Sequence, residues 1–331
     1  MFRWLASYKA VAVAVTASVG VVCATLVAQQ APPIFRANVN LVHVLASVKN
    51  AKGELVGKLQ KSDFRIFDNG AEQEIKVFEP QSLQPLSVAL MIDASGSTKI
   101  DLKYETDSAS KFLKALLTQG NPQDAVALYR FDSDITAMRP FTHNFPSLDI
   151  ALKTVKGSGG TSLYDAIYFG ASDLSKRGGR KVIVVISDGG NTTSSMGIDK
   201  ALKEAQLADA VIYPVVVVPI TNEAGRNTGG EHALIFMAEG TGGRTFFPNF
   251  GQQLDAAFAD IIAELRTQYF LGYYPQNVPL TKNPFHKLEV RLASPDLRVS
   301  ARNGYYGDAE GAGSAADAPI AVTPAGMTKK K

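Results

Sequence analysis

The sequence has few of the residues that form disulfides in small secreted proteins or bind zinc: it contains one cysteine and four histidines among 331 residues. Because Cys23 has no second cysteine to pair with, the chain forms no intramolecular disulfide, and packing must stabilise the fold. The histidines are His43, His143, His232 and His286, and none stands at metalloprotease spacing from another. These absences exclude a disulfide scaffold and give no indication of a zinc enzyme.

Catalytic motifs and a strong charge of one sign are also missing. The sequence contains neither a Gly-x-Ser-x-Gly elbow nor a Walker-type Gly-Lys-Ser/Thr loop. Its formal net charge of +3 falls to +1 when Arg3 and Lys9 are set aside, and no basic stripe stands out. We therefore expect no nucleic-acid partner. What the sequence does have is 46% hydrophobic residues, enough to bury a large core.

The longest apolar run lies at the N-terminus. A basic head, MFRWLASYK, precedes residues 10–28, which carry no charged side chain, and the small residues Ala24 and Ala28 offer sites for a signal peptidase. A run of about 19 residues is long for a signal peptide and just long enough to span a bilayer. Residues 1–28 thus indicate an exported protein, periplasmic or secreted, with either a cleaved signal or a membrane anchor. Any contact with a membrane is expected through this segment alone.

The remaining sequence divides into regions that differ in their hydrophobic periodicity. Residues 34–80 alternate like β-strands, with a hairpin signal at Asp68-Asn69-Gly70, and residues 269–307 return to a β pattern. Residues 84–268 alternate strands that are apolar on both faces with amphipathic helices, which is typical of a doubly wound, mainly parallel α/β sheet. We expect the two β segments to form one small β-sandwich that flanks this domain. Residues 308–331 lack periodicity and are expected to be a disordered tail.

The first predicted helix of the α/β region follows directly after an acidic and hydroxyl-rich stretch. In the stretch YETDSASKFLKALL, helical periodicity places five residues on one inward face: Tyr104, Phe112, Leu113, Leu116 and Leu117.

Oxygen-bearing side chains cluster where three predicted strands or loops end. Asp93, Ser95 and Ser97 follow the first parallel strand, Thr161 lies in a glycine-rich loop before a helix, and Asp188 ends another strand. Loops at the carboxyl ends of parallel strands meet at one edge of the sheet, so these side chains are expected to converge. An all-oxygen ligand set suits Mg²⁺, Mn²⁺ or Ca²⁺. Each piece alone also has a plainer explanation, as a helix N-cap, a loop hydroxyl or a turn.

The complete set, Asp-x-Ser-x-Ser followed by a distant Thr and a distant Asp, resembles the metal-ion-dependent adhesion site of the von Willebrand factor type A domain. The resemblance covers roughly residues 84–268. It implies a mainly parallel sheet with one short antiparallel edge strand, and a Mg²⁺ ion held by Ser95, Ser97 and Thr161, with Asp93 and Asp188 acting partly through water. The flanking stretches YFLGYYP and NGYYG look like those of exported bacterial proteins that carry this domain.

The expected function is metal-dependent protein binding without catalysis. Three neutral hydroxyl ligands would leave the ion electrophilic, with a position that an acidic residue of a protein partner completes. Two alternatives stay open. One is a metal-dependent hydrolase or phosphatase with an aspartyl nucleophile, although a phosphatase of the haloacid dehalogenase type needs a second aspartate where this chain has Ser95. The other is a metal-free scaffold that keeps the motif as capping chemistry.

Overall fold

The computed structural model describes residues 41–80, 84–98, 101–157, 159–217, 227–249, 252–279 and 284–307. The predicted signal or anchor and the predicted C-terminal tail lie outside these residues. Within the described part of the chain, no helix has both the length and the apolar character needed to cross a bilayer.

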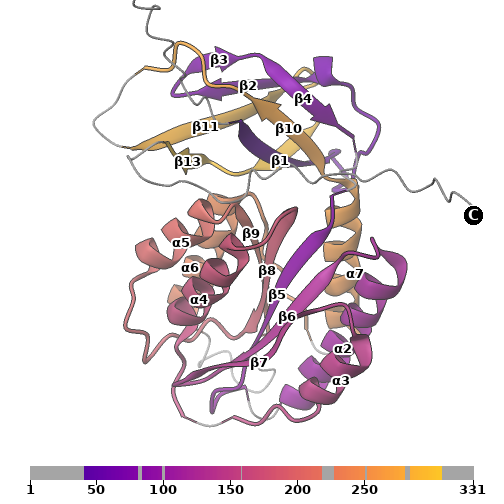
Figure 1. The fold of residues 1–331 in the computed structure, drawn as a ribbon, viewed down its shortest axis with the longest axis vertical. Helices are drawn as coiled ribbons and strands as arrows, with labels where there is room; N and C mark the ends of the chain where they lie inside the picture. Colours follow the sequence, from indigo (N-terminus) through magenta and orange to yellow (C-terminus); the bar gives the residue numbers. More distant parts are fainter. Residues whose placement is uncertain are drawn as a thin grey trace, which may run out of the picture. The chain divides into compact units, whose positions relative to one another are not determined.

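A five-stranded sheet forms the centre of the α/β region, with strand order β7-β6-β5-β8-β9 (Figure 1). The strands are β5 (Leu86–Asp93), β6 (Ala125–Phe131), β7 (Ile135–Thr142), β8 (Arg180–Ser187) and β9 (Ala210–Val216). Strand β5 pairs in parallel with β6 and β8, β8 pairs in parallel with β9, and β7 runs antiparallel at the edge. The predicted fold class, a mainly parallel sheet with one antiparallel edge strand, is confirmed.

Helices cover both faces of this sheet, as Figure 1 shows. The helices on one face are α2 (Leu102–Gln119), α3 (Phe145–Leu152) and α7 (Gln252–Thr267), and those on the other are α4 (Leu163–Ser175), α5 (Ile198–Leu207) and α6 (Thr228–Thr241). All eight residues of β5 are buried. Leu90 packs into the first core and Met91 into the second, because successive strand residues point to opposite faces. Two-sided burial explains why these strands are apolar throughout.

Two four-stranded antiparallel sheets complete the described chain, with orders β12-β1-β10-β4 and β13-β11-β2-β3. Their strands are β1 (Val42–Lys49), β2 (Phe64–Asp68), β3 (Ala71–Gln73), β4 (Ile75–Glu79), β10 (Tyr269–Tyr273), β11 (Phe285–Leu292), β12 (Arg298–Ala301) and β13 (Gly304–Tyr306), and a short 3-10 helix, η1 (Lys61–Asp63), precedes β2. Each sheet mixes strands that precede the α/β region with strands that follow it, and both contribute to one apolar core. The additional sheets therefore form a β-sandwich.

The hairpin signal before the α/β region is confirmed. Asn69 and Gly70 both have positive φ, 47° and 85°, between the paired strands β2 and β3. Two consecutive residues with positive φ give a turn whose twist matches the twist of the flanking strands, which is why Asn-Gly serves so well there.

Candidate metal centre

The first group of oxygens stands at the carboxyl end of β5. Asp93 has no exposed surface, and its Oδ1 accepts a hydrogen bond of 2.9 Å from the Ser95 amide. Its Oδ2 accepts a 2.6 Å bond from the hydroxyl of Ser187, the last residue of β8. The hydroxyl oxygens of Ser95 and Ser97 lie 3.1 Å apart. Thr98 closes the turn by donating its hydroxyl to the Asp93 carbonyl at 2.9 Å.

These residues do not cap the following helix. Helix α2 begins at Leu102, and its N-cap residue is Asp101, whose side chain makes no capping hydrogen bond. The plainer explanation of Asp93, Ser95 and Ser97 as an N-cap is therefore wrong, and their oxygens are held together by the loop itself.

The glycine-rich loop packs directly on this turn. The Gly96 amide donates to the Gly159 carbonyl at 3.2 Å. A Cβ atom on Gly157 would lie 1.4 Å from the carbonyl oxygen of Ala94, so only glycine permits this approach. Thr161 follows this loop, is buried, and holds the turn after β8 by accepting amide bonds from Thr192 and Thr193 at its carbonyl.

The third group stands at the end of β8. The Asp188 Oδ1 atom accepts a 2.8 Å hydrogen bond from the Gly190 amide. A Cβ on Gly190 would lie 3.0 Å from Asp188 Oδ1 and 3.4 Å from the Thr161 hydroxyl oxygen, so both oxygens border the same small space beside Gly190. The next residue after Asp188, Gly189, has a φ of 83°. Its carbonyl packs against Gly230 in the first turn of α6. The three loops thus meet at one sheet edge.

Acidic side chains accumulate at this edge: Asp93 and Glu105 are buried, and Asp188 is partly buried. Burial raises the pKa of Asp93 to about 6; hydrogen bonds from Ser187 and Ser95 lower it, and the charge of Asp188 raises it. Burial also raises the pKa of Glu105 well above its usual value, and the charges of Asp93, Asp101 and Asp188 add to this effect. A divalent ion would offset this accumulated charge, so the donor set fits an oxygen-liganded cation.

The composition of the cluster separates it from zinc-type sites. Among the described residues, no three His, Cys, Asp or Glu side chains gather in a way that could hold a metal. The candidate centre has two carboxylates and three hydroxyls, an all-oxygen set of the kind that Mg²⁺, Mn²⁺ and Ca²⁺ bind.

Two further residues at this edge were not predicted from the sequence. Ser187 fixes the Asp93 carboxylate, and its only signal was its position immediately before Asp188. Glu105 was overlooked because the helix phase was assigned wrongly: Tyr104 is 58% exposed, whereas Glu105 is fully buried. The inward residue in the first turn of α2 is therefore an acid and not an aromatic side chain. Phe112, Leu113, Leu116 and Leu117 are buried as predicted.

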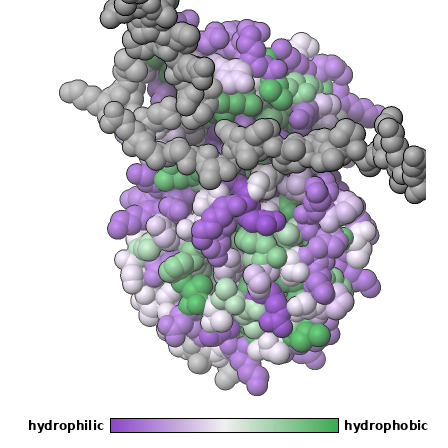
Figure 2. Space-filling view, in the orientation of Figure 1, coloured by the Kyte–Doolittle hydropathy of each residue, from purple (hydrophilic) through white to green (hydrophobic). Residues whose placement is uncertain are grey.

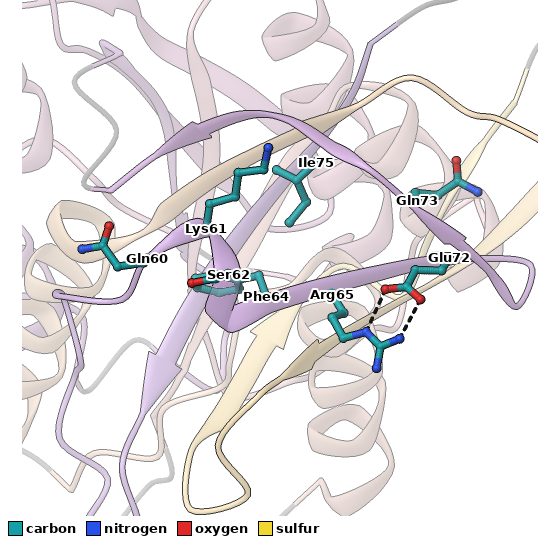
Figure 3. A pocket seen from close by; sticks show the side chains of 8 residues that line it. All are labelled: Gln60, Lys61, Ser62, Phe64, Arg65, Glu72, Gln73 and Ile75. Carbon is teal, nitrogen blue, oxygen red and sulfur yellow. Dashed lines mark hydrogen bonds and ion pairs between the residues drawn. The ribbon is translucent and has the colours of Figure 1, made fainter.

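A pocket on the β-sandwich lies apart from this cluster (Figure 3). Its lining includes Phe64, Ile75 and the exposed ion pair of Arg65 with Glu72, at 2.6 Å. None of the candidate ligands lines it. In Figure 3 Arg65 and Glu72 face each other across their ion pair, and the other lining side chains are those of Gln60, Lys61, Ser62, Phe64, Gln73 and Ile75.

The surface offers no large apolar face in the view of Figure 2, where hydrophilic and hydrophobic residues are interspersed. The large exposed apolar side chains in the described regions stand on separate elements: Tyr104, Ile150, Phe169, Leu207, Phe236, Phe247 and Tyr274. Scattered exposed apolar residues are ordinary for a soluble surface.

The geometry and the residue order now allow a comparison with known proteins. Residues 88–191 match the family model of the von Willebrand factor type A domain. The matched segment contains Asp93, Ser95, Ser97, Thr161 and Asp188, the five candidate ligands. A comparison with curated proteins gave no match.

Solved structures with a similar fold include three bacterial proteins. The conserved hypothetical protein BatB from Bacteroides thetaiotaomicron is 18% identical, covers 54% of this chain and 98% of its own, and has a TM-score of 0.44. The vWF domain of the type V pili tip protein Mfa5 from Porphyromonas gingivalis is 15% identical, with coverage of 54% and 94% and a TM-score of 0.45. The pilus adhesin SpaC from Lactobacillus rhamnosus GG is 12% identical, with coverage of 73% and 47% and a TM-score of 0.47. At these values, the similarities carry no functional conclusion for this chain.

The contact of Gly157 with Ala94 makes a direct prediction about the site. In Gly157→Ala the added methyl group would overlap the Ala94 carbonyl, so the glycine-rich loop must move away from the Asp93 turn. We expect the free energy of unfolding to fall by about 1–3 kcal/mol, the usual cost of overpacking. Chemical denaturation measures this. Gly178→Ala is the matched control, because a Cβ there meets nothing within 4 Å. Equal stability of the two variants would contradict the close approach of the loops.

Proposed function

We propose that this chain is an exported, non-enzymatic protein-binding module whose interaction depends on a divalent metal ion. The observation that supports it most is the convergence of five oxygen-bearing side chains from three loops at the carboxyl edge of the α/β sheet. In this proposal Ser95, Ser97 and Thr161 hold the ion through their hydroxyls. Asp93 and Asp188 act partly through water. Mg²⁺ is the expected ion, with Mn²⁺ or Ca²⁺ as substitutes.

The burial of the ligands favours an ion held at the surface rather than in a closed cage. Asp93, Ser95 and Thr161 are buried, whereas Ser97 and the neighbouring Gly96 are exposed. An ion bound among them would be held on its inner side by buried side chains and would face solvent on its outer side. A partner's Asp or Glu side chain could then complete its coordination shell, and charge attraction would supply much of the specificity.

Two observations disfavour the hydrolase alternative. An aspartyl nucleophile needs a free carboxylate oxygen that can reach a substrate. Asp93 has no exposed surface, and both of its carboxylate oxygens already accept hydrogen bonds, one from the Ser95 amide and one from the Ser187 hydroxyl.

The metal-free scaffold gains no support from helix capping, because α2 begins at Leu102 and its N-cap residue is Asp101, not a candidate ligand.

A carboxylate probe tests the open coordination position. Two blocked tripeptides, identical except for a central Glu or Gln, are added to the full-length protein loaded with Mn²⁺. Paramagnetic Mn²⁺ broadens the proton resonances of a peptide that approaches it. We expect the Glu peptide to be broadened more than the Gln peptide, and we expect it to tighten Mn²⁺ binding, because the two ligands must affect each other equally.

Two results would count against the proposal. If wild-type protein does not bind Mn²⁺ or Mg²⁺, the metal centre is absent. If it binds Mn²⁺ but treats the two peptides alike, the ion is structural, and recognition of an acidic partner is wrong.

A further inference from the structure

Glu105 is unusual among the buried acids of the described chain. It has no exposed surface, and neither of its carboxylate oxygens has a hydrogen-bond partner. Glu264, which is also fully buried, is paired with Arg244 at 2.7 Å and Lys49 at 3.2 Å. A buried carboxylate without partners is costly, because it loses its hydration and gains nothing in return. Glu105 therefore calls for an explanation beyond packing.

The side chain of Glu105 lies on the buried side of α2, the helix that follows the Asp93 turn. It lies three residues after Leu102 and four before Ala109, both buried against the sheet, so it shares the inward face of α2. It stands in the first turn of that helix, and its neighbours Leu102 and Ala109 share one core cluster with Ile92 and Ala94, which flank Asp93. Burial is the main cause that raises the pKa of Glu105 well above its usual value, and the charges of Asp93, Asp101 and Asp188 raise it further.

We propose that Glu105 is a further acidic group of the metal centre, which reaches the divalent ion through water from the inner side of the site. This inference rests on the proposed function, since it requires that an ion is bound there. A cation and its ordered water would give the Glu105 carboxylate both the charge compensation and the hydrogen bonds that the described residues do not supply. Groups that orient metal ligands or their water from outside the first shell typically change metal affinity about 10- to 100-fold.

The proposal predicts two effects of opposite sign in Glu105→Gln. Without metal and at neutral pH, the variant should melt at a higher temperature than wild type, because burial of Glu105 requires either an unpaired charge or the uptake of a proton, and the amide requires neither. With metal, it should bind Mn²⁺ about 10- to 100-fold more weakly. A purely structural role for Glu105 would lower the melting temperature and leave Mn²⁺ affinity unchanged.

The experiment is a titration of the full-length protein with Mn²⁺, followed by electron paramagnetic resonance of the free ion, beside melting curves in chelator. Asp107→Asn is the matched control, because it removes one negative charge from an exposed position of the same helix. It should bind Mn²⁺ within about two-fold of wild type, as expected for an exposed and screened charge. If Glu105→Gln does not fold, Glu105→Met, which replaces the acid by an apolar side chain of similar volume, takes its place.

The outcomes separate this inference from the function on which it rests. Failure of wild-type protein to bind Mn²⁺ would overturn both. Normal binding by wild type, with unchanged affinity in Glu105→Gln or Glu105→Met, would overturn the role of Glu105 alone. Weakened Mn²⁺ binding together with a higher metal-free melting temperature would support it.

Discussion

The substitution Asp93→Asn should greatly weaken divalent-ion binding while leaving the fold intact. Asparagine keeps the shape of aspartate, and its side-chain oxygen can still accept from the Ser95 amide, now 2.9 Å from Asp93 Oδ1. What it loses is the negative charge at the centre of the five candidate ligands. We expect Mn²⁺ affinity to fall by about 100-fold, the upper end of the range for groups that act on a metal through its ligands or its water. Calorimetric titration with Mn²⁺ and Mg²⁺ measures the loss.

A matched variant separates this local effect from a general loss of charge. Asp134 lies exposed in the loop after β6, at the same edge of the sheet, and Asp134→Asn removes an equal charge without touching a candidate ligand. Its Mn²⁺ affinity should stay within a few-fold of wild type. Equal losses in both variants would mean that the edge attracts cations only diffusely, and the five-ligand centre would be wrong.

The metal-free proteins should differ in their pH dependence. Burial raises the pKa of Asp93 to about 6, above the usual carboxyl value of 3.8, so the folded state binds this proton more tightly than the unfolded state. Wild-type protein then loses stability as pH rises from about 4 through 6, a loss that Asp93→Asn lacks. In chelator, the stability advantage of Asp93→Asn should therefore be larger at pH 7.5 than at pH 4.5. Denaturation at the two pH values tests this.

The candidate ligands could be found from the sequence because each is tied to a local signal. Asp93 and Asp188 end apolar runs that are unmistakable as buried strands, and parallel pairing brings such ends to one edge. Thr161 directly follows a glycine-rich stretch, which marks a loop before the next helix. The pattern of residues thus determines both the fold class and the position of the cluster without any long-range pairing being known.

Glu105 and Asp68 could not be identified in this way. Tyr104 and Glu105 are adjacent, and a shift of helix phase by one residue exchanges which of them points inward; hydrophobicity favours Tyr104, but the structure buries Glu105. The sequence marked Asp68 only as part of a hairpin signal with Asn69 and Gly70. It is fully buried because partners from strands more than 200 residues away in sequence surround it. Pairing of distant segments leaves no mark on the local sequence.

These distant partners make Asp68 the polar centre of the β-sandwich. Its Oδ2 accepts hydrogen bonds from the hydroxyls of Tyr273 at 2.8 Å and Tyr305 at 2.7 Å, and its Oδ1 lies 3.0 Å from His286 Nδ1. The four residues come from β2, β10, β13 and β11, and β10 belongs to the opposite sheet from the other three. Burial raises the pKa of both tyrosines, so they remain neutral donors at physiological pH. Asp68 thus joins the two sheets and the two halves of the sandwich sequence.

We expect Asp68→Ala to lower the free energy of unfolding by about 3–5 kcal/mol, because it removes the buried acceptor that the Tyr273 and Tyr305 hydroxyls share and that His286 contacts. Glu72→Ala, on the adjacent strand β3, is the control. It breaks the exposed ion pair with Arg65 and should change the free energy of unfolding far less than Asp68→Ala does, because exposed ion pairs contribute little to stability. Chemical denaturation of the three proteins gives both differences.

Hydrogen exchange shows which strands lose amide protection in Asp68→Ala. Strand β5 enters the α/β sheet from the sandwich side at Leu86, whereas the candidate ligands follow its other end at Asp93. Asp68→Ala should therefore lose amide protection chiefly in β1–β4 and β10–β13, and should keep wild-type Mn²⁺ affinity as long as the α/β region stays folded. A small stability change like that of Glu72→Ala would mean that apolar packing alone joins the two sheets. Loss of protection spread evenly through β5, β6 and β8 would instead mean that the sandwich and the α/β region unfold as one cooperative unit.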